Sequence, residues 1–123
     1  MSGDKLLLDS NIVLYLLNGD NTLADFLDNK QLFISIITEM ELLSYKGLSA
    51  KESKQIRSFL TECKIININS SIKNEAIQIR KENNAKLPDS IIAATSIYLD
   101  FPLITADSGF KKIAKIELIY YEL

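Results

Sequence analysis

The chain has 123 residues, 47% of them hydrophobic and 24% charged, a net charge of −2, and neither histidine nor tryptophan. This length fits one compact core, so we expect residues 1–123 to form a single domain. The absence of histidine excludes Ser-His-Asp triads, HExxH zinc sites and imidazole bases. Any catalysis must therefore use carboxylates, hydroxyls, lysines or a metal ion.

The cysteine content and the N-terminal sequence predict the cellular setting. A single cysteine, Cys63, cannot form an intramolecular disulfide or a multi-cysteine zinc site. The N-terminal apolar runs are interrupted by Asp9, Ser10 and Asn11, which argues against a signal peptide and against a membrane span. We therefore expect a soluble protein of the reducing cytoplasm, with no membrane partner.

The first half of the chain is predicted to alternate strands and helices. Lys5–Leu8 is a short aliphatic run typical of a strand, and polar capping residues separate it from a helical pattern that extends to Leu17. We then predict a brief helix over 22–28, a strand over 32–34 and a helix over 35–45. After the break at Gly47, a charged amphipathic helix is predicted over 49–62.

The second half continues this alternation. A β-branched strand is predicted over 64–68, helices over 70–83 and 88–99, a strand over 102–105, a short helix over 110–114 and a last strand over 116–121. About five strands alternating with helices predict a three-layer α/β/α fold with a mainly parallel sheet. Such sheets bind ligands outside the carboxyl ends of their strands, which directs attention to the residues that follow each strand.

Four acids stand at positions where such a site is expected. Asp9 and Asp107 follow predicted strands, whereas Glu41 and Asp89 lie early in predicted helices. Each of them taken singly also has an ordinary structural role, because aspartate is a frequent helix cap and turn residue. Carboxylates without nitrogen or sulfur ligands match the preference of hard divalent cations such as Mg²⁺ and Mn²⁺.

Asp89 fits the purely structural interpretation least well. It shares a predicted helical face with Ile92, Ala93 and Ser96, so its side chain is expected to point toward packed surface. A buried carboxylate needs a compensating partner, and no basic residue is adjacent in sequence. The partner must therefore be a distant cation or a metal ion.

The motifs around these acids resemble those of PIN-domain nucleases, particularly the small VapC-type toxins. The motifs are LLLDSN at 6–11, SIITEMEL at 35–42, LPDSIIAA at 87–94 and LITAD at 103–107, in matching order and spacing. The resemblance implies a PIN-like α/β/α fold and a site for Mg²⁺ or Mn²⁺ held by Asp9, Glu41, Asp89 and Asp107.

The resemblance also distinguishes among neighbouring residues. It selects Glu41 over Glu39, because Glu41 lies three residues after Thr38 and directly before a leucine. Asn11 and Thr105 match polar positions that line the same pocket in the family, and we add Thr38 and Ser108 as pocket candidates. Many family members carry a further acid or asparagine where this chain has Gly109, so the number of metal ions stays open. Ser108 could replace that ligand weakly, although a turn role is simpler.

The resemblance implies a metal-dependent endoribonuclease in which Asp9 or Asp107 helps to deprotonate the water that attacks an RNA phosphodiester. It further implies the toxin of a type II toxin–antitoxin pair, with a small antitoxin as partner and a homodimer as the usual assembly. Without the four acids, 14 basic and 12 acidic side chains remain, a balance of +2. Several cations could contact phosphate, although a solvated helix surface explains each more simply: Lys46, Lys51, Lys54, Arg57, Arg80, Lys81 and Lys86.

Three alternatives stay open. The chain could be an inactive PIN-like RNA-binding or scaffold subunit, or a solitary PIN nuclease that processes RNA. It could also be a haloacid-dehalogenase-like phosphatase with Asp9 as nucleophile. That chemistry usually requires a second aspartate where this chain has Asn11, and a cap that 123 residues hardly accommodate.

Overall fold

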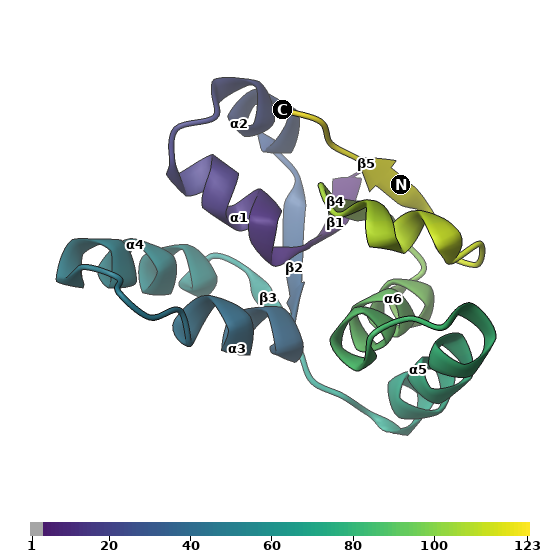
Figure 1. Cartoon of the computed structure of the whole chain (residues 1–123). Coiled ribbons are helices and arrows are strands. Elements are labelled where there is room, and N and C mark those ends of the chain that lie inside the picture. Colours follow the sequence, from purple (N-terminus) through teal and green to yellow (C-terminus); the bar gives the residue numbers. More distant parts are fainter. Residues whose placement is uncertain (1–3) are drawn as a thin grey trace.

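The computed structural model describes residues 4–123. At its centre lies a five-stranded sheet with the strand order β3-β2-β1-β4-β5, and every neighbouring pair is parallel. The predicted α/β fold is confirmed, and its sheet is wholly rather than mainly parallel (Figure 1). The strands are β1 (Lys5–Leu8), β2 (Gln31–Ser35), β3 (Lys64–Ile66), β4 (Leu103–Thr105) and β5 (Leu118–Tyr120).

Buried residues alternate across the sheet, so each central strand contributes to two cores. Successive side chains in a strand point to opposite faces, which requires apolar residues at consecutive positions when both faces are covered. One core receives Leu7, Phe33 and Leu103. Their sequence neighbours enter the other core: Leu6, Leu8, Ile34 and Ile104.

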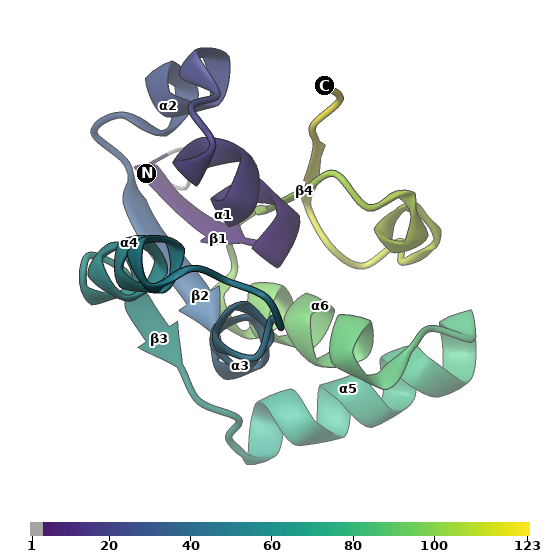
Figure 2. The ribbon, with the colours of Figure 1, turned by 60° about the vertical axis from the view of Figure 1, so that its left-hand side comes forward.

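Helices cover both faces and complete three layers (Figure 2). The core that contains Leu7 is covered by α5 (Ser70–Asn83), α6 (Leu87–Leu99) and the 3₁₀ helix η2 (Ser108–Lys112). The opposite core is covered by α1 (Ser10–Leu17), α2 (Asn21–Leu27) and α4 (Ala50–Thr61). Helix α3 (Ile36–Leu43) buries Leu42 in that second core and packs Ile37 against the first.

Several predicted boundaries are wrong by a few residues. The helix predicted over 110–114 is the 3₁₀ helix Ser108–Lys112, which begins earlier because the Asp107 side chain caps it. The predicted strands over 64–68 and 116–121 are shorter, because only Lys64–Ile66 and Leu118–Tyr120 pair with their neighbouring strands. Between residues 4 and 123, no helix has the length and apolar character needed to cross a membrane.

The strand order places the point of chain reversal between β1 and β4. From β1 the chain adds β2 and β3 on one side, and after α5 and α6 it returns to add β4 and β5 on the other. Leu8 of β1 is paired with Ile104 of β4, so the residues that follow these two strands lie next to each other. Open parallel sheets bind ligands in the crevice at such a reversal.

Candidate functional site

Asp9 is a buried carboxylate at the junction of β1 and α1. It is the N-cap residue of α1, and the residue as a whole is only 5% exposed. One carboxylate oxygen, Oδ1, accepts a hydrogen bond from the backbone N–H of Ser10 at 2.9 Å. The other, Oδ2, accepts one from the Thr105 hydroxyl at 2.7 Å. Both carboxylate oxygens are therefore held in fixed directions.

Two further hydrogen bonds fix the end of β4, one of them within the segment and one to α1. The Thr105 hydroxyl is fully buried and accepts the backbone N–H of Asp107 at 3.0 Å. The Asn11 side-chain oxygen accepts the backbone N–H of Ala106 at 3.2 Å. The Asp9–Thr105 and Asn11–Ala106 hydrogen bonds join segments about a hundred residues apart in sequence, and they place Asp9 and Asp107 at the same end of the sheet.

Asp107 is exposed and caps η2 through a hydrogen bond from the Gly109 N–H to its Oδ1 at 2.8 Å. A Cβ atom added at Gly109 would lie only 3.1 Å from that same oxygen. An acidic residue at this position would therefore force the Asp107 side chain to move. Ser108 is an exposed residue of η2.

Helix α3 supplies two polar atoms that have no partner. Ser35 caps the helix by accepting the Ile37 N–H at 3.1 Å, and the next turn carries Thr38, which is fully buried. Thr38 Oγ1 and Glu41 Oε1 are both buried without any hydrogen-bond partner among the described residues. Unpaired buried polar atoms are rare in native structures and require an explanation.

Asp89 lies in the first turn of α6, behind Pro88, and is half-buried. A carboxylate at this end of a helix is favoured by the helix dipole. The residue before the helix, Lys86, serves as the N-cap position without a side-chain capping bond. Asp89 therefore enters the site as the fourth carboxylate, from a different layer than Asp9.

Burial and neighbouring acids raise the pKa values of three of the four carboxyls. Burial is the main cause that raises the pKa of Asp9, with a smaller contribution from Asp107. Burial likewise raises the pKa of Glu41, together with the charges of Asp9 and Asp89. The pKa of Asp89 is raised by burial and by Asp107 and Asp9. A cluster of like charges that perturb one another in this way is typical of a functional site.

The chemistry of these donors fits a hard divalent cation. None of the ion pairs formed within residues 4–123 involves any of the four acids, and Glu41 Oε1 is a buried oxygen without a donor. Oxygen ligands of this kind suit Mg²⁺ or Mn²⁺. In the part of the chain that the structure describes, no three such side chains are close enough to hold one ion as they stand.

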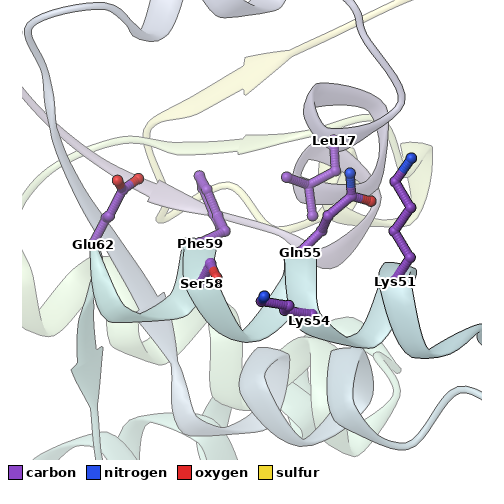
Figure 3. Close-up of a pocket in the computed structure, with 7 residues that line it drawn as sticks. All are labelled: Leu17, Lys51, Lys54, Gln55, Ser58, Phe59 and Glu62. Carbon is purple, nitrogen blue, oxygen red and sulfur yellow. The ribbon is translucent and has the colours of Figure 1, made fainter.

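A hollow lies elsewhere on the molecule. It measures about 370 Å³ and is formed between the end of α1 and the outer side of α4. Figure 3 shows Leu17 of α1 facing Gln55 and Phe59 of α4, with Lys51 beside them. None of the four acids lines this hollow.

One residue beside the cluster was not predicted from the sequence. Lys112, the last residue of η2, lies close enough to Asp89 to lower the pKa of its carboxyl, as does Lys86. The only available signal was the pair of lysines that follows Asp107 in the same short helix. Cys63, in contrast, is partly buried against the Phe59 carbonyl, and burial raises the pKa of its thiol to about 12.

Comparison with known proteins places the chain in a family. Residues 6–116 match the PIN domain. A chain of a toxin–antitoxin complex from Klebsiella pneumoniae is 31% identical, with 96% of this chain and 99% of that chain covered and a TM-score of 0.82. A comparison with curated proteins gave no match.

Two further solved structures share the fold at lower identity. One is VapBC2 from Rickettsia felis bound to a promoter DNA fragment, at 23% identity, 96% and 99% coverage and a TM-score of 0.81. The other is DNA-bound VapBC from Salmonella typhimurium, at 20% identity, 94% and 97% coverage and a TM-score of 0.79. With Asp9 and Asp107 following β1 and β4 at the reversal of a parallel sheet, the chain belongs to the PIN-domain family, whose members are nucleases.

Proposed function

We propose that this PIN-domain chain is a Mg²⁺- or Mn²⁺-dependent endoribonuclease and the toxin of a toxin–antitoxin pair. The observation that carries the proposal is a set of four acids, none of which belongs to an ion pair within residues 4–123. Burial and neighbouring acids of the set raise the pKa values of Asp9, Glu41 and Asp89, and Glu41 Oε1 is buried without a hydrogen-bond partner among the described residues. Such a set is costly unless a cation compensates it.

The residues that would hold the ion are Asp9, Glu41, Asp89 and Asp107. When bound, the divalent ion would offset the charge of the phosphodiester and make water a stronger nucleophile at neutral pH. Asp9 keeps a fixed orientation because Thr105 and the Ser10 N–H hold its two oxygens. Asp107 has an exposed carboxylate that can accept a proton from water beside the scissile phosphate.

Asn11, Thr38, Thr105 and Ser108 are proposed as supporting residues of this site. Asn11 and Thr105 hold the backbone that carries Asp107, through the N–H groups of Ala106 and Asp107. Thr38 lies one turn before Glu41 on α3, and its unpartnered hydroxyl could donate to that carboxylate or to a ligand after a small rotation. Ser108 is exposed next to Asp107 and could contact substrate.

The proposed partner follows from the similarity to a toxin–antitoxin complex at 31% identity. We propose that a small antitoxin binds this chain and blocks the four acids, and that two copies of the chain form a homodimer. Exposed apolar side chains on α3 support an assembly, because Met40 is 59% and Leu43 49% exposed. RNA as the substrate rests on the resemblance of the four acid-bearing motifs to VapC-type toxins.

The test compares cleavage by the purified wild type and by three variants. Single-stranded RNA and DNA oligonucleotides are incubated with Mg²⁺, Mn²⁺ or EDTA. We expect metal-dependent cleavage of RNA by the wild type, and loss of at least a hundredfold in rate for Asp9→Asn and Glu41→Gln. The matched control Glu39→Gln makes the same chemical change two residues earlier on α3 and should retain activity. Equal activity of Asp9→Asn and the wild type would refute the site.

A second experiment tests the biological role. Expression of the wild type in bacteria should arrest growth, and co-expression with the small reading frame next to its gene should restore it. Co-purification of the two proteins should accompany the rescue. Cleavage of RNA without growth arrest or a bound partner would instead favour a solitary RNA-processing nuclease, and binding of RNA without cleavage would favour a scaffold subunit.

A further inference from the structure

Two lysines lie in the same segments as Asp89 and Asp107 and form no ion pair within the described residues. Lys86 directly precedes α6 and is three residues before Asp89. Lys112 ends η2, the short helix whose N-cap is Asp107. Both lysines are exposed, and neither belongs to an ion pair found among residues 4–123. Each of the two acids from the later part of the chain therefore has a free cation within a few residues.

Lys112 is held in place by a neutral group. Its Nζ donates a hydrogen bond to the backbone carbonyl of Asn84 at 3.1 Å. Asn84 is the left-handed C-cap of α5, with φ 50° and ψ 41°, in the turn that leads to α6. Both ribbon views show η2, in yellow-green, next to this turn (Figures 1 and 2). A carbonyl positions the ammonium without cancelling its charge, and an ammonium has further N–H donors to offer.

The neighbouring lysine is engaged differently. The Lys111 ammonium lies over the ring of Tyr120, 3.9 Å from the centroid. It therefore occupies a cation–π contact with β5. The two adjacent lysines of η2 differ in surroundings but have the same charge and are both exposed. This difference provides a matched pair for experiment.

The mixed charge of these segments identifies the kind of ligand. Lys86 stands at the N-cap position of α6, whose first turn carries Asp89, and Lys112 ends η2, whose N-cap is Asp107. A divalent ion held by the acids would attract one anionic group, and the two ammonium groups would attract a second anionic group beside it. A chain of phosphodiesters presents anionic groups in such a series, and lysine binds them as a point charge.

We propose that Lys112, together with Lys86, forms a phosphate subsite that binds a backbone phosphate of the RNA strand adjacent to the phosphate that is cleaved. The proposal rests on the proposed function, because it concerns the same site. The two lysines position the strand and do not take part in bond cleavage. Lys112 is pre-organised by the Asn84 carbonyl, whereas Lys86 is placed by the start of α6.

The test measures RNA affinity as a function of salt. A fluorescein-labelled single-stranded RNA oligonucleotide is titrated with wild type in EDTA, and with Asp9→Asn in Mg²⁺, by fluorescence anisotropy from about 50 to 200 mM NaCl. Lys112→Ala, Lys86→Ala and the control Lys111→Ala are then compared in both backgrounds. Each phosphate contact contributes about 0.7 to the slope of log K against log salt for a single strand.

We expect Lys112→Ala and Lys86→Ala to weaken binding about three- to tenfold at low salt and to lower the salt slope by about 0.7 each. Lys112→Arg should restore both affinity and slope, because it keeps the charge. A purely structural role for Lys112 would change thermal stability but not the slope. Equal slopes for Lys112→Ala and Lys111→Ala, or no RNA binding by the wild type, would overturn the subsite.

Failure of the two proposals can be told apart. If the wild type cleaves RNA in Mg²⁺ and Lys112→Ala binds with an unchanged salt slope, the subsite is wrong and the nuclease assignment stands. If the wild type does not cleave RNA but Lys112→Ala and Lys86→Ala lose affinity and slope, the nuclease assignment is wrong and the phosphate subsite stands.

Discussion

Replacing Thr105 by valine removes one hydroxyl from the centre of the site at nearly constant volume. That hydroxyl donates to Asp9 Oδ2 at 2.7 Å and accepts the Asp107 N–H at 3.0 Å, and it is fully buried. A hydrogen bond to a charged group is worth about 1.5–3 kcal/mol. For a protein of this size 1 kcal/mol corresponds to about 4 °C in melting temperature, so we expect Thr105→Val to lower it by about 6–12 °C at pH 7.5.

Thr95→Val is the matched control. Thr95 is 1% exposed, and its hydroxyl donates at 2.7 Å to the carbonyl of Ile91 within α6. This bond is neutral on both sides and is worth about 1 kcal/mol, so its loss should lower the melting temperature by about 4 °C. The comparison separates the loss of any buried hydroxyl from the loss of the one that supports the carboxylate.

The destabilisation caused by Thr105→Val should depend on pH. The Thr105 hydrogen bond favours the ionised form of Asp9 and lowers its pKa, against burial, which raises it. The variant should therefore have a still higher Asp9 pKa. Its extra destabilisation should be present at neutral pH and should shrink on acidification, as Asp9 becomes protonated. Melting followed by circular dichroism in EDTA checks this. An effect of Thr105→Val no larger than that of Thr95→Val, or one independent of pH, would refute the reasoning.

Three further outcomes follow from the same structure. In EDTA, the folded-state pKa values of Asp9, Glu41 and Asp89 are raised, so their contribution to stability is full below about pH 4 and is lost as pH rises through those values. The melting temperatures of the wild type and of Asp9→Asn, plotted against pH, should therefore diverge. Parallel plots for the two proteins would contradict this. Mn²⁺ should raise the melting temperature of the wild type at pH 7.5, and the increase should be smaller for Glu41→Gln than for Glu39→Gln; equal increases in the two variants would exclude Glu41 as a ligand. Burial raises the pKa of the Cys63 thiol from an ordinary 9.0 to about 12, so Cys63 should react with a thiol reagent at pH 8 about a thousandfold more slowly in the folded protein than in guanidinium. Similar rates in both would show that the folded protein does not protect this thiol.

Local sequence features predicted most of the architecture because they act over a few residues. Consecutive apolar residues such as Leu6, Leu7 and Leu8 predict a strand covered on both faces, and the polar residue that follows predicts a cap. Both are present, since β1 ends at Leu8 and Asp9 caps α1. The misplaced 3₁₀ helix shows the limit, because its start depends on the hydrogen bond between Asp107 and Gly109.

The sequence by itself determined which acids are candidates, and through the order of four motifs it indicated the family. It did not determine that Asp9 accepts a hydrogen bond from Thr105, that Glu41 has an unpartnered oxygen, or that Lys112 donates to the Asn84 carbonyl. Those relations depend on β1 pairing with β4 and on η2 packing beside the turn after α5. Residues 96 positions apart are brought within hydrogen-bond distance only by strand order, which no local pattern encodes.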